Sequence, residues 1–332
     1  MKIVFYGVHS YDIEFFTRAN KNFGFECVFQ RAHLNIHTTA LAQGSEIVCL
    51  FVNDFADRKV IEEFSRIGVK LIALRCAGFN NVDLNAAAQY GIKVVRVPAY
   101  SPYAVAEHAC ALILTLNRKI HRAYLRTKDG NFSLHGLMGF DMHGKTAGII
   151  GTGKVAKKLI KILQGFDIDV LAYDLYPDLE YAKNNHFRYT DLNEIFEKSD
   201  IISLHCPLTE DTTYIINESS IAKMKPGVMI INTGRGKLID SEALIEGLKQ
   251  HKIGAAGLDV YEEEANYFYD DNSDNIIDDD KLARLLSFNN VVITSHQAFF
   301  THEAVSNIAE RTLENVKEFI EGKPLSCEVK NI

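Results

Sequence analysis

Short apolar runs alternate with amphipathic stretches along the whole chain. The apolar runs have the length and β-branched content of buried strands, and the amphipathic stretches repeat with helical periodicity. This alternation predicts an α/β fold in which helices connect parallel strands. Before residue 100 we expect a helix over 57–68 and strands at 2–8, 26–30, 46–51, 70–75 and 93–97.

A long helical pattern follows, "SPYAVAEHACALILTLNRKI" at residues 101–120. Ser101 is the expected N-cap, and Pro102 occupies the first helical position. Residues 104–116 are apolar on nearly every face, which predicts a buried helix, with a place between two domains as one option. The apolar runs that come next predict a second parallel sheet: "TAGIIG", "DVLAYD", "DIISLH", "VMIINTG", "GAAGLDV" and "NVVITSH".

A chain of 332 residues is too long for one ordinary hydrophobic core, and the two strand series predict two domains. The last helical pattern, at about 302–321, lies beyond the second series and can return to the first domain. We therefore expect one domain from residues 1–100 and 300–332, and another from residues 101–299. The crossings at 98–101 and 298–301 are the expected hinges.

Composition limits the classes of function. The chain is 47% hydrophobic and 24% charged, and its net charge of -7 argues against a general affinity for nucleic acid or anionic lipid. The N-terminal "MKIVFYGV" does not look like a signal peptide and no apolar run reaches membrane-spanning length, so a cytoplasmic protein is expected. The six cysteines show no CxxC pair or zinc-like spacing, which predicts reduced thiols and no metal centre.

Residues 146–174, "TAGIIGTGKVAKKLIKILQGFDIDVLAYD", carry a dinucleotide-binding fingerprint. Gly151 permits a tight turn, Gly153 lets the backbone approach a pyrophosphate, and the small Ala156 lets the helix pack on the strand. The N-terminus of that helix offers unpaired N–H groups to phosphate. Asp174 ends the next strand, where a carboxylate accepts hydrogen bonds from ribose hydroxyls and repels a 2′-phosphate, so NAD is favoured over NADP. A glycine-rich turn without a nucleotide is the alternative, and the complete context disfavours it.

Polar groups follow three strands of the second series: Arg235 in "INTGRG", Glu264 in "GLDVYEEE" and His296 in "VVITSH". Ligands of open parallel sheets bind at the carboxyl ends of the strands. Hydride transfer to a carbonyl builds negative charge on its oxygen, and His296 can supply the proton. A guanidinium such as Arg235 can hold a substrate carboxylate through two parallel hydrogen bonds. Glu264, if bonded to the other imidazole nitrogen, would favour the imidazolium and hold its orientation.

The chain resembles the D-isomer-specific 2-hydroxyacid dehydrogenase family over essentially its whole length. The motifs that carry the resemblance are "RCAGFNNVDL", "VPAYSPYAVAEHA", "GKTAGIIGTGK", "SLHCPLT", "INTGRGKLID", "GLDVYEEE" and "SHQAFFT". Within the family, the chain looks most like the members that reduce pyruvate to D-lactate in fermentation. The resemblance implies a Rossmann NAD-binding domain and a smaller flavodoxin-like substrate domain, with a cleft between them. It also implies that Arg235 binds substrate, Glu264 is the acidic partner and His296 is the proton donor.

The resemblance further implies contacts for cofactor and substrate. Thr212 stands where close relatives often have Asn. "CAG" looks like the family loop whose backbone N–H groups face the substrate carboxylate, while Tyr100 and Phe299 wall a small pocket. Aromatic walls favour a methyl group over a charged group that would lack a partner, so pyruvate fits best. The implied cofactor residues are Gly151, Gly153, Lys154, Val155, Asp174, Cys206, Pro207, Thr212, Thr233, Gly234 and Asp259, and the implied substrate residues are Cys76, Ala77, Gly78, Tyr100, Arg235, His296 and Phe299.

Other patterns in the sequence do not indicate a second site. "DDNSDNIIDDD" at 270–280 lacks the glycine and the final glutamate of a calcium loop. His205 and Cys206 are neighbours on a predicted strand, so their side chains should point to opposite faces and not share a proton. The resemblance assigns the basic stretch 117–128 to a contact between subunits of a homodimer or homotetramer. The alternatives are a dehydrogenase for another D-2-hydroxy acid and an NAD-sensing regulatory protein of the same fold.

Overall fold

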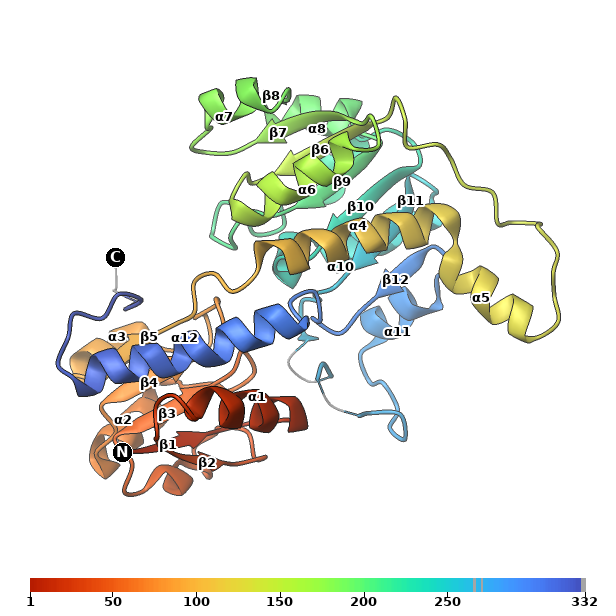
Figure 1. Cartoon of the computed structure of the whole chain (residues 1–332). Helices are drawn as coiled ribbons and strands as arrows, with labels where there is room; N and C mark the ends of the chain where they lie inside the picture. Colours follow the sequence, from red (N-terminus) through yellow and green to blue (C-terminus); the bar gives the residue numbers. More distant parts are fainter. Residues whose placement is uncertain (265–266, 270, 330–332) are drawn as a thin grey trace. The chain divides into compact units, whose positions relative to one another are not determined.

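The computed structural model describes residues 1–264, 267–269 and 271–329. The chain divides into two compact units, one formed by Met1–Ser101 with Phe300–Ile332 and the other by Pro102–Phe299 (Figure 1). Each unit is built on its own parallel sheet flanked by helices, as the alternation of apolar and amphipathic segments predicts.

The first unit has a five-stranded sheet in the order β2-β1-β3-β4-β5. All its strand pairs are parallel, and this order is the flavodoxin-like one. Its elements are β1 (Lys2–Phe5), α1 (Ser10–Asn20), β2 (Glu26–Phe29), a 3₁₀ helix η1 (Thr39–Ala42), β3 (Ile47–Leu50), α2 (Arg58–Ile67), β4 (Leu71–Leu74), α3 (Leu84–Gln89), β5 (Lys93–Val95) and α12 (His302–Ile320).

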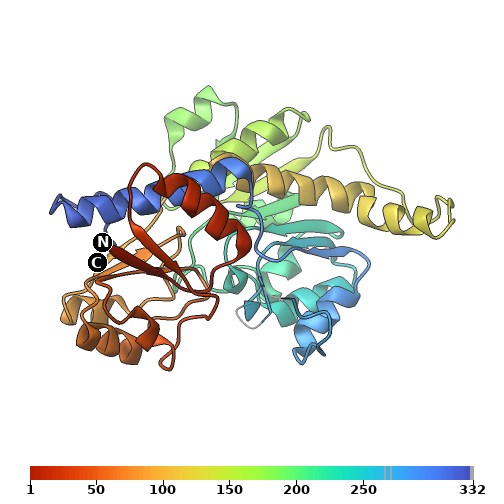
Figure 2. The same ribbon diagram turned by 60° about the horizontal axis from the view of Figure 1, so that its bottom comes forward.

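Local sequence explains these elements. All the residues of β3 and β4 are buried, as expected for central strands covered on both faces. The predicted helix over 57–68 is α2: the side chain of Asp57 accepts a hydrogen bond from the N–H of Val60, and Gly68 ends the helix in the left-handed conformation (φ +92°). The C-terminal helix α12 packs against α1 and β4 of this unit, and Figure 2 shows α12 beside α1.

The second unit has a seven-stranded sheet in the order β12-β11-β10-β9-β6-β7-β8. The strand order reverses at β6, which lies between β7 and β9, so the sheet is doubly wound in the Rossmann manner. Its elements are α4 (Pro102–Arg118), α5 (Ile120–Lys128), β6 (Thr146–Ile150), α6 (Lys154–Gln164), β7 (Asp169–Tyr173), α7 (Leu179–Asn184), β8 (Arg188–Tyr189), α8 (Leu192–Lys198), β9 (Ile201–Leu204), α9 (Glu218–Lys223), β10 (Val228–Asn232), a 3₁₀ helix η2 (Gly236–Leu238), α10 (Ser241–Lys249), β11 (Ile253–Leu258), α11 (Asp280–Ser287) and β12 (Val291–Ile293).

Two apolar clusters fill the two faces of this sheet. On one face, residues of α4 and α6 such as Leu112 and Leu159 pack with Ile149 and Ile231 of the strands, and Figure 1 shows both helices along that face. On the other face the cluster includes buried residues of α8, α9, α10 and α11. The predicted fold class, with two doubly wound parallel-sheet units, is confirmed.

The structure corrects some details of the sequence analysis. The strands are shorter than predicted, because the chain leaves each sheet to begin a loop before its apolar run ends. β12 stops at Ile293, well before His296, and the two-residue strand β8 has no apolar run that predicts it. The predicted buried helix is α4, which packs against α6, β10, β11 and β12 of its own unit.

Candidate active site

The glycine-rich turn lies at the reversal of strand order. Gly151 follows β6 with φ +88°, and a side chain there would meet the backbone nitrogen of Cys206 at 2.5 Å. Glycine therefore lets the end of β6 approach the residue after β9 closely. Gly153 is the N-cap of α6, and no atom lies within 4 Å of the position that a Cβ would take. Because Ala156 is fully buried, α6 packs tightly on the sheet, and its first residues, Lys154 and Val155, leave backbone N–H groups for phosphate.

Asp174 follows β7 and faces the glycine-rich turn. Its Oδ2 accepts hydrogen bonds from the backbone nitrogen (2.6 Å) and the hydroxyl (2.8 Å) of Thr152, and its Oδ1 accepts one from the nitrogen of Tyr176 (2.9 Å). Burial acts to raise the pKa of Asp174, but these hydrogen bonds outweigh it and the pKa is lowered. A carboxylate that stays ionised at neutral pH thus stands beside the turn.

The other predicted cofactor residues follow β9, β10 and β11. The hydroxyl of Thr233 is buried and has no hydrogen-bond partner among the described residues, which is costly unless a ligand supplies one. The nitrogen of the next residue, Gly234, donates to the side chain of Asn232. The hydroxyl of Thr212 donates to the carbonyl of Pro207 (2.7 Å), so it shapes its own loop. Burial raises the pKa of the Cys206 thiol to about 11, which keeps the thiol neutral.

His296 and Glu264 form a hydrogen-bonded pair. His296 Nδ1 lies 2.8 Å from Glu264 Oε1, and the second oxygen of Glu264 accepts a hydrogen bond from the backbone nitrogen of Tyr261 at 3.0 Å. Only 16% of the His296 side chain is exposed, so the pair is screened from most solvent. In the described part of the chain, no protein group is bonded to His296 Nε2, and that nitrogen can therefore face a substrate.

Arg235 stands at the end of β10, close to the segment that carries Glu264. A side chain at the next position, Gly236, would overlap the carbonyl oxygen of Tyr261 at 2.0 Å, so glycine lets the two segments lie in contact. One guanidinium nitrogen of Arg235 donates to the carbonyl of Gly234 at 2.7 Å. Its other N–H groups make no hydrogen bond to Glu264 or His296 among the residues that the structure describes, which leaves them for a ligand.

Residues 294–298, here called the His296 loop, connect β12 to the end of this unit. His296 has a left-handed backbone (φ +52°), which costs a non-glycine residue about 1 kcal/mol or more. The buried carboxylate of Asp259 holds the loop: its Oδ1 accepts hydrogen bonds from the Thr294 hydroxyl (2.6 Å) and the Gln297 nitrogen (2.9 Å), and its Oδ2 accepts one from the Ala298 nitrogen (2.8 Å). Asp259, implied as a cofactor contact, thus has both oxygens bonded within the protein and no exposed surface.

The predicted substrate loop lies in the first unit, directly after β4. Cys76 is buried, its thiol donates to the carbonyl of Gly78, and its own carbonyl accepts from the nitrogen of Val97. The guanidinium of Arg96 donates to the carbonyl of Ala77 at 2.9 Å. These bonds fix the backbone of the "CAG" loop. Tyr100 belongs to the same unit, whereas Phe299, Arg235, Glu264 and His296 belong to the second.

A buried ionic cluster lies beside that loop, and the sequence analysis missed it. The guanidinium of Arg75 lies 3.3 Å from Asp12 Oδ1 and 4.0 Å from Asp54 Oδ2, and it donates to the carbonyl of Gly7 at 2.8 Å. Burial acts to lower the pKa of Arg75, but the two carboxylates outweigh it and the pKa is raised. An arginine directly after the apolar strand "LIAL" was the available signal.

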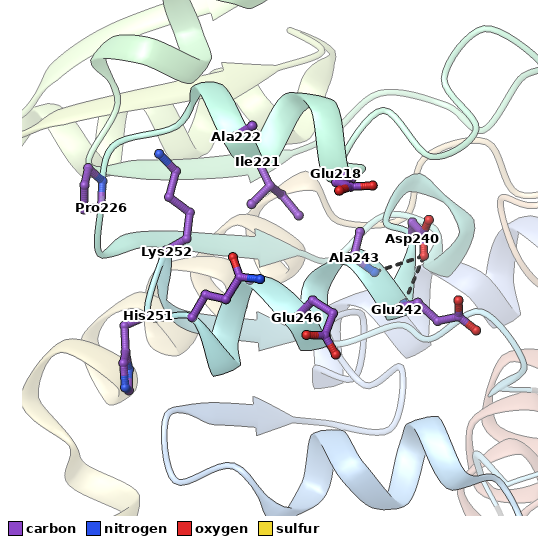
Figure 3. A pocket seen from close by; sticks show the side chains of 12 residues that line it. Glu218, Ile221, Ala222, Pro226, Asp240, Glu242, Ala243, Glu246, His251 and Lys252 are labelled. Carbon is purple, nitrogen blue, oxygen red and sulfur yellow. Dashed lines mark hydrogen bonds between the residues drawn. The ribbon is translucent and has the colours of Figure 1, made fainter.

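A separate pocket is lined by residues of α9 and α10 and of the loops beside them. Figure 3 shows it lined by Glu218, Asp240 and Glu246, with Lys252 at one end, and its volume is about 720 Å³. None of its lining residues is a predicted site residue. Asp240 is already engaged, since it caps α10 through the nitrogens of Glu242 and Ala243.

Two rejected signals can be compared with the structure. Asp270, the first residue of the calcium-like stretch, lies outside the described residues, and no group of metal-ligating side chains occurs among those that are described. His205 and Cys206 follow β9 instead of ending it. His205 Nε2 pairs with the Ser203 hydroxyl at 2.8 Å, and burial lowers the pKa of His205 to about 4. A neutral imidazole beside a neutral thiol does not form a reactive ion pair.

The fold and the fingerprint define a dinucleotide-binding protein, and comparison with known proteins defines the family. The family model for the NAD-binding domain of D-isomer specific 2-hydroxyacid dehydrogenases matches residues 110–298. A D-lactate dehydrogenase of Escherichia coli is 52% identical over 97% of this chain and 98% of that protein. The chain belongs to the D-isomer-specific 2-hydroxyacid dehydrogenase family, and its second unit contains the NAD-binding domain.

Solved structures agree with this assignment. A structure described as the pyruvate reductase of Chlamydomonas reinhardtii has a TM-score of 0.92 and 43% identity, and covers 98% of each chain. A D-lactate dehydrogenase of Lactobacillus jensenii with NAD⁺ has a TM-score of 0.82 and 30% identity, and covers 100% of both chains. Every helix in the described ranges is too short or too polar to cross a lipid bilayer.

Proposed function

We propose that this protein is an NAD-dependent D-lactate dehydrogenase that reduces pyruvate. The observation that carries the proposal is the 2.8 Å hydrogen bond between His296 and Glu264, in the same unit as the glycine-rich turn. The similarity to proteins named as D-lactate dehydrogenase and pyruvate reductase supports the choice of substrate.

The residues at the carboxyl ends of β6, β7 and β10 fit NAD. The open side of Gly153 and the N-terminus of α6 suit the pyrophosphate, the ionised Asp174 suits a ribose without a 2′-phosphate, and the unpartnered Thr233 hydroxyl suits a further polar group. NADH, when bound, supplies the hydride. The backbone N–H groups of Lys154 and Val155 and the backbone of Gly151 complete the proposed contact set, with Cys206, Pro207 and Gly234 on the neighbouring loops.

The protein's own residues then orient the substrate and move the proton. Arg235 binds the substrate carboxylate through the N–H groups that face no protein acceptor. His296 donates the proton on Nε2 to the carbonyl oxygen, which is becoming an alkoxide. Glu264 accepts the Nδ1 hydrogen bond, so it holds the ring in one orientation and stabilises the imidazolium that gives up the proton.

Substrate choice is assigned to the first unit together with Phe299. The backbone N–H groups of the Cys76, Ala77 and Gly78 loop would bind the carboxylate, and the aromatic rings of Tyr100 and Phe299 would surround the methyl group. Phe299 is buried, so a larger or charged side chain would meet an apolar wall without a polar partner. This part of the proposal assigns substrate-binding residues to both units.

The direct test is steady-state kinetics on the purified chain. NADH absorbance should fall with pyruvate, and NAD⁺ should be reduced with D-lactate and not with L-lactate. A panel of straight, branched and aromatic 2-oxo acids, glyoxylate included, should rank pyruvate first by kcat/KM. A higher kcat/KM for a larger 2-oxo acid would reassign the substrate, and NADH binding without turnover on the whole panel would reject the enzymatic proposal.

We also propose that the protein is a homodimer or homotetramer. After α5, whose residues are all at least partly exposed, the chain carries Phe132, Leu134 and Met138 with 76%, 83% and 88% of their surface exposed. Exposed apolar side chains in such number favour contact with a second copy. Light scattering during gel filtration should give a multiple of 37.3 kDa, and replacing these three residues by serine should reduce it to a single chain.

A cytoplasmic location is proposed on the basis of the thiols. All six cysteines are free in the structure, which suits a reducing compartment. Cell fractionation with an antibody to the protein would test this location, and recovery outside the cytoplasmic fraction would contradict it.

A further inference from the structure

The helix α4 carries a histidine that reaches the His296 loop from the sheet side. His108 Nε2 lies 3.0 Å from the hydroxyl oxygen of Thr294 and 3.4 Å from Asp259 Oδ1. The ring is largely buried, with 19% of its side chain exposed. His108 lies within the motif "VPAYSPYAVAEHA", but the resemblance assigns it no role. It interrupts an apolar helical stretch, where a buried polar side chain is costly unless it is hydrogen-bonded.

The hydrogen-bond directions in this group are determined by counting protons. A hydroxyl has one hydrogen, and Thr294 gives it to the carboxylate of Asp259 across 2.6 Å. The oxygen of Thr294 must therefore accept at its contact with His108, so His108 Nε2 carries a proton. That proton points at Thr294 and at Asp259, the two residues that hold the start of the His296 loop.

The backbone of His108 is held in a buried part of α4, whereas the loop that its side chain contacts has a strained backbone. Its neighbours on α4, Ala106 and Ala109, are fully buried in the core of the second unit. His296 adopts φ +52° and depends on surrounding bonds to stay there. Asp259 supplies several of those bonds, and among described residues His108 is the one side chain with a basic nitrogen within 4 Å of its carboxylate.

We propose that His108 is a positioning residue for the proton donor. Through Thr294 and Asp259 it fixes the loop from which His296 faces the substrate, and it makes no contact with substrate itself. This inference rests on the proposed function for its kinetic consequence, while its structural part concerns the loop alone. The contact between His108 and Thr294 should affect the rate of the reaction, because a displacement of about 1 Å in a proton donor can reduce turnover by about 100-fold.

The test uses the full-length protein, four single variants and one double variant. His108→Ala removes the bond, and His108→Gln places an amide N–H near the position of Nε2. Thr294→Val keeps the shape of the side chain and removes the hydroxyl. His143→Ala is the matched control, because His143 also faces an aspartate (Asp167, 3.4 Å) but is 79% exposed.

Two measurements separate positioning from a purely structural role. Hydrogen exchange of the 294–298 peptide should become about tenfold faster in His108→Ala and Thr294→Val and stay unchanged in His143→Ala, since the Gln297 and Ala298 amides lose a fixed acceptor. With the 2-oxo acid that the wild-type protein reduces, kcat should fall by about 10- to 100-fold in both variants, with KM for NADH within about threefold. His108→Gln should recover most of the rate, and the His108→Ala, Thr294→Val double variant should be no slower than the slower single one.

Each contrary result is distinct. Unchanged exchange in His108→Ala would overturn the proposal whatever the activity. So would faster exchange with an unchanged kcat, a lower melting temperature with no change in kcat, or a double variant in which the two losses multiply. A wild-type protein that reduces no 2-oxo acid would reject the proposed function, and in that case the exchange data alone would decide whether His108 holds the loop.

Discussion

The two units bury carboxylates near the carboxyl ends of their sheets in different ways. In the first unit, Asp12 and Asp54 share the permanently charged guanidinium of Arg75, and Asp54 also binds two backbone amides and His33. In the second unit, Asp259 faces a hydroxyl, two backbone amides and a histidine. A buried ion pair that loses one partner leaves an uncompensated charge, whereas a carboxylate held mainly by hydroxyl and amide donors loses only part of its support when one of them is removed. The first group therefore serves the stability of its unit, and the second serves the geometry of one loop.

Removing the cation of the first unit should have the largest effect on stability. Arg75→Leu leaves Asp12 and Asp54 buried without their cation, and we expect the free energy of unfolding to fall by about 3–5 kcal/mol. Urea unfolding followed by circular dichroism would measure it. Arg18→Leu is the control, because the Arg18 pair with Glu14 is exposed and should contribute less than about 1 kcal/mol. Equal losses in the two variants would remove the contrast between the two units.

Removing the charge of the Asp259 carboxylate in the second unit should affect turnover more than stability. Asp259→Asn keeps the size of the side chain but turns an N–H₂ group toward a donor of the His296 loop. We expect kcat for pyruvate to fall about 100-fold and the free energy of unfolding to fall by about 1–3 kcal/mol. Asp141→Asn, at an exposed position, should change neither quantity. An Asp259→Asn protein that unfolds as easily as Arg75→Leu but turns over normally would invert the comparison.

His205 is a buried titratable group that has no carboxylate partner among the described residues, and it can be compared with the two carboxylate groups. His205 pairs with the Ser203 hydroxyl, and burial lowers the pKa of His205 to about 4, below its ordinary value. As pH falls from about 6.5 toward 4, His205 binds a proton in the unfolded chain but not in the folded chain. The contribution of neutral His205 to stability is therefore fully present above this pH range and is lost within it. Between pH 6.5 and 4.5, the free energy of unfolding should fall by about 2 kcal/mol less in His205→Gln than in the wild-type protein. Parallel stability curves for the two proteins would show that His205 titrates normally.

Asp174 is the acid whose replacement should have the smallest effect, and the role we propose for it is to select the cofactor. Because its lowered pKa keeps it ionised at neutral pH, it should repel the 2′-phosphate of NADPH there. Asp174→Ser should raise kcat/KM for NADPH relative to NADH by about tenfold. Asp169→Ser, at the other end of the same strand, serves as the control. An unchanged ratio would mean that Asp174 does not select the cofactor.

Much of the fold follows from periodic patterns that are local in the sequence. The buried strands β3, β4, β6 and β10 appear as apolar runs, and the turn at Gly151 is specified by glycines whose spacing is visible in the sequence. The ends of the strands are less predictable. The run "VVITS" suggests a strand that continues to His296. In the structure β12 ends at Ile293, and beyond it the backbone nitrogens of Thr294 and His296 donate to the carbonyls of Leu258 and Asp259 as the chain leaves the sheet.

Contacts between distant residues could not be predicted in the same way. The pairing of Arg75 with Asp12 and Asp54 brings together the first turn of α1 and the segments that follow β3 and β4, and no local pattern encodes it. Similarly, the sequence places His108 in an apolar helix without showing that Thr294 lies opposite it. The resemblance suggested a cofactor contact for Asp259, whereas the burial of its carboxylate depends on where the backbone amides of the His296 loop point.

The central claim is that His296, held by Glu264, gives its proton to the substrate carbonyl. Single-turnover reduction of pyruvate by pre-bound NADH tests this most directly, because it removes product release from the measured rate. His296→Ala should slow that step by about 10²–10⁴-fold while the dissociation constant for NADH, measured by fluorescence, stays within about threefold. A His296→Ala protein that reduces pyruvate at the wild-type single-turnover rate would contradict the account.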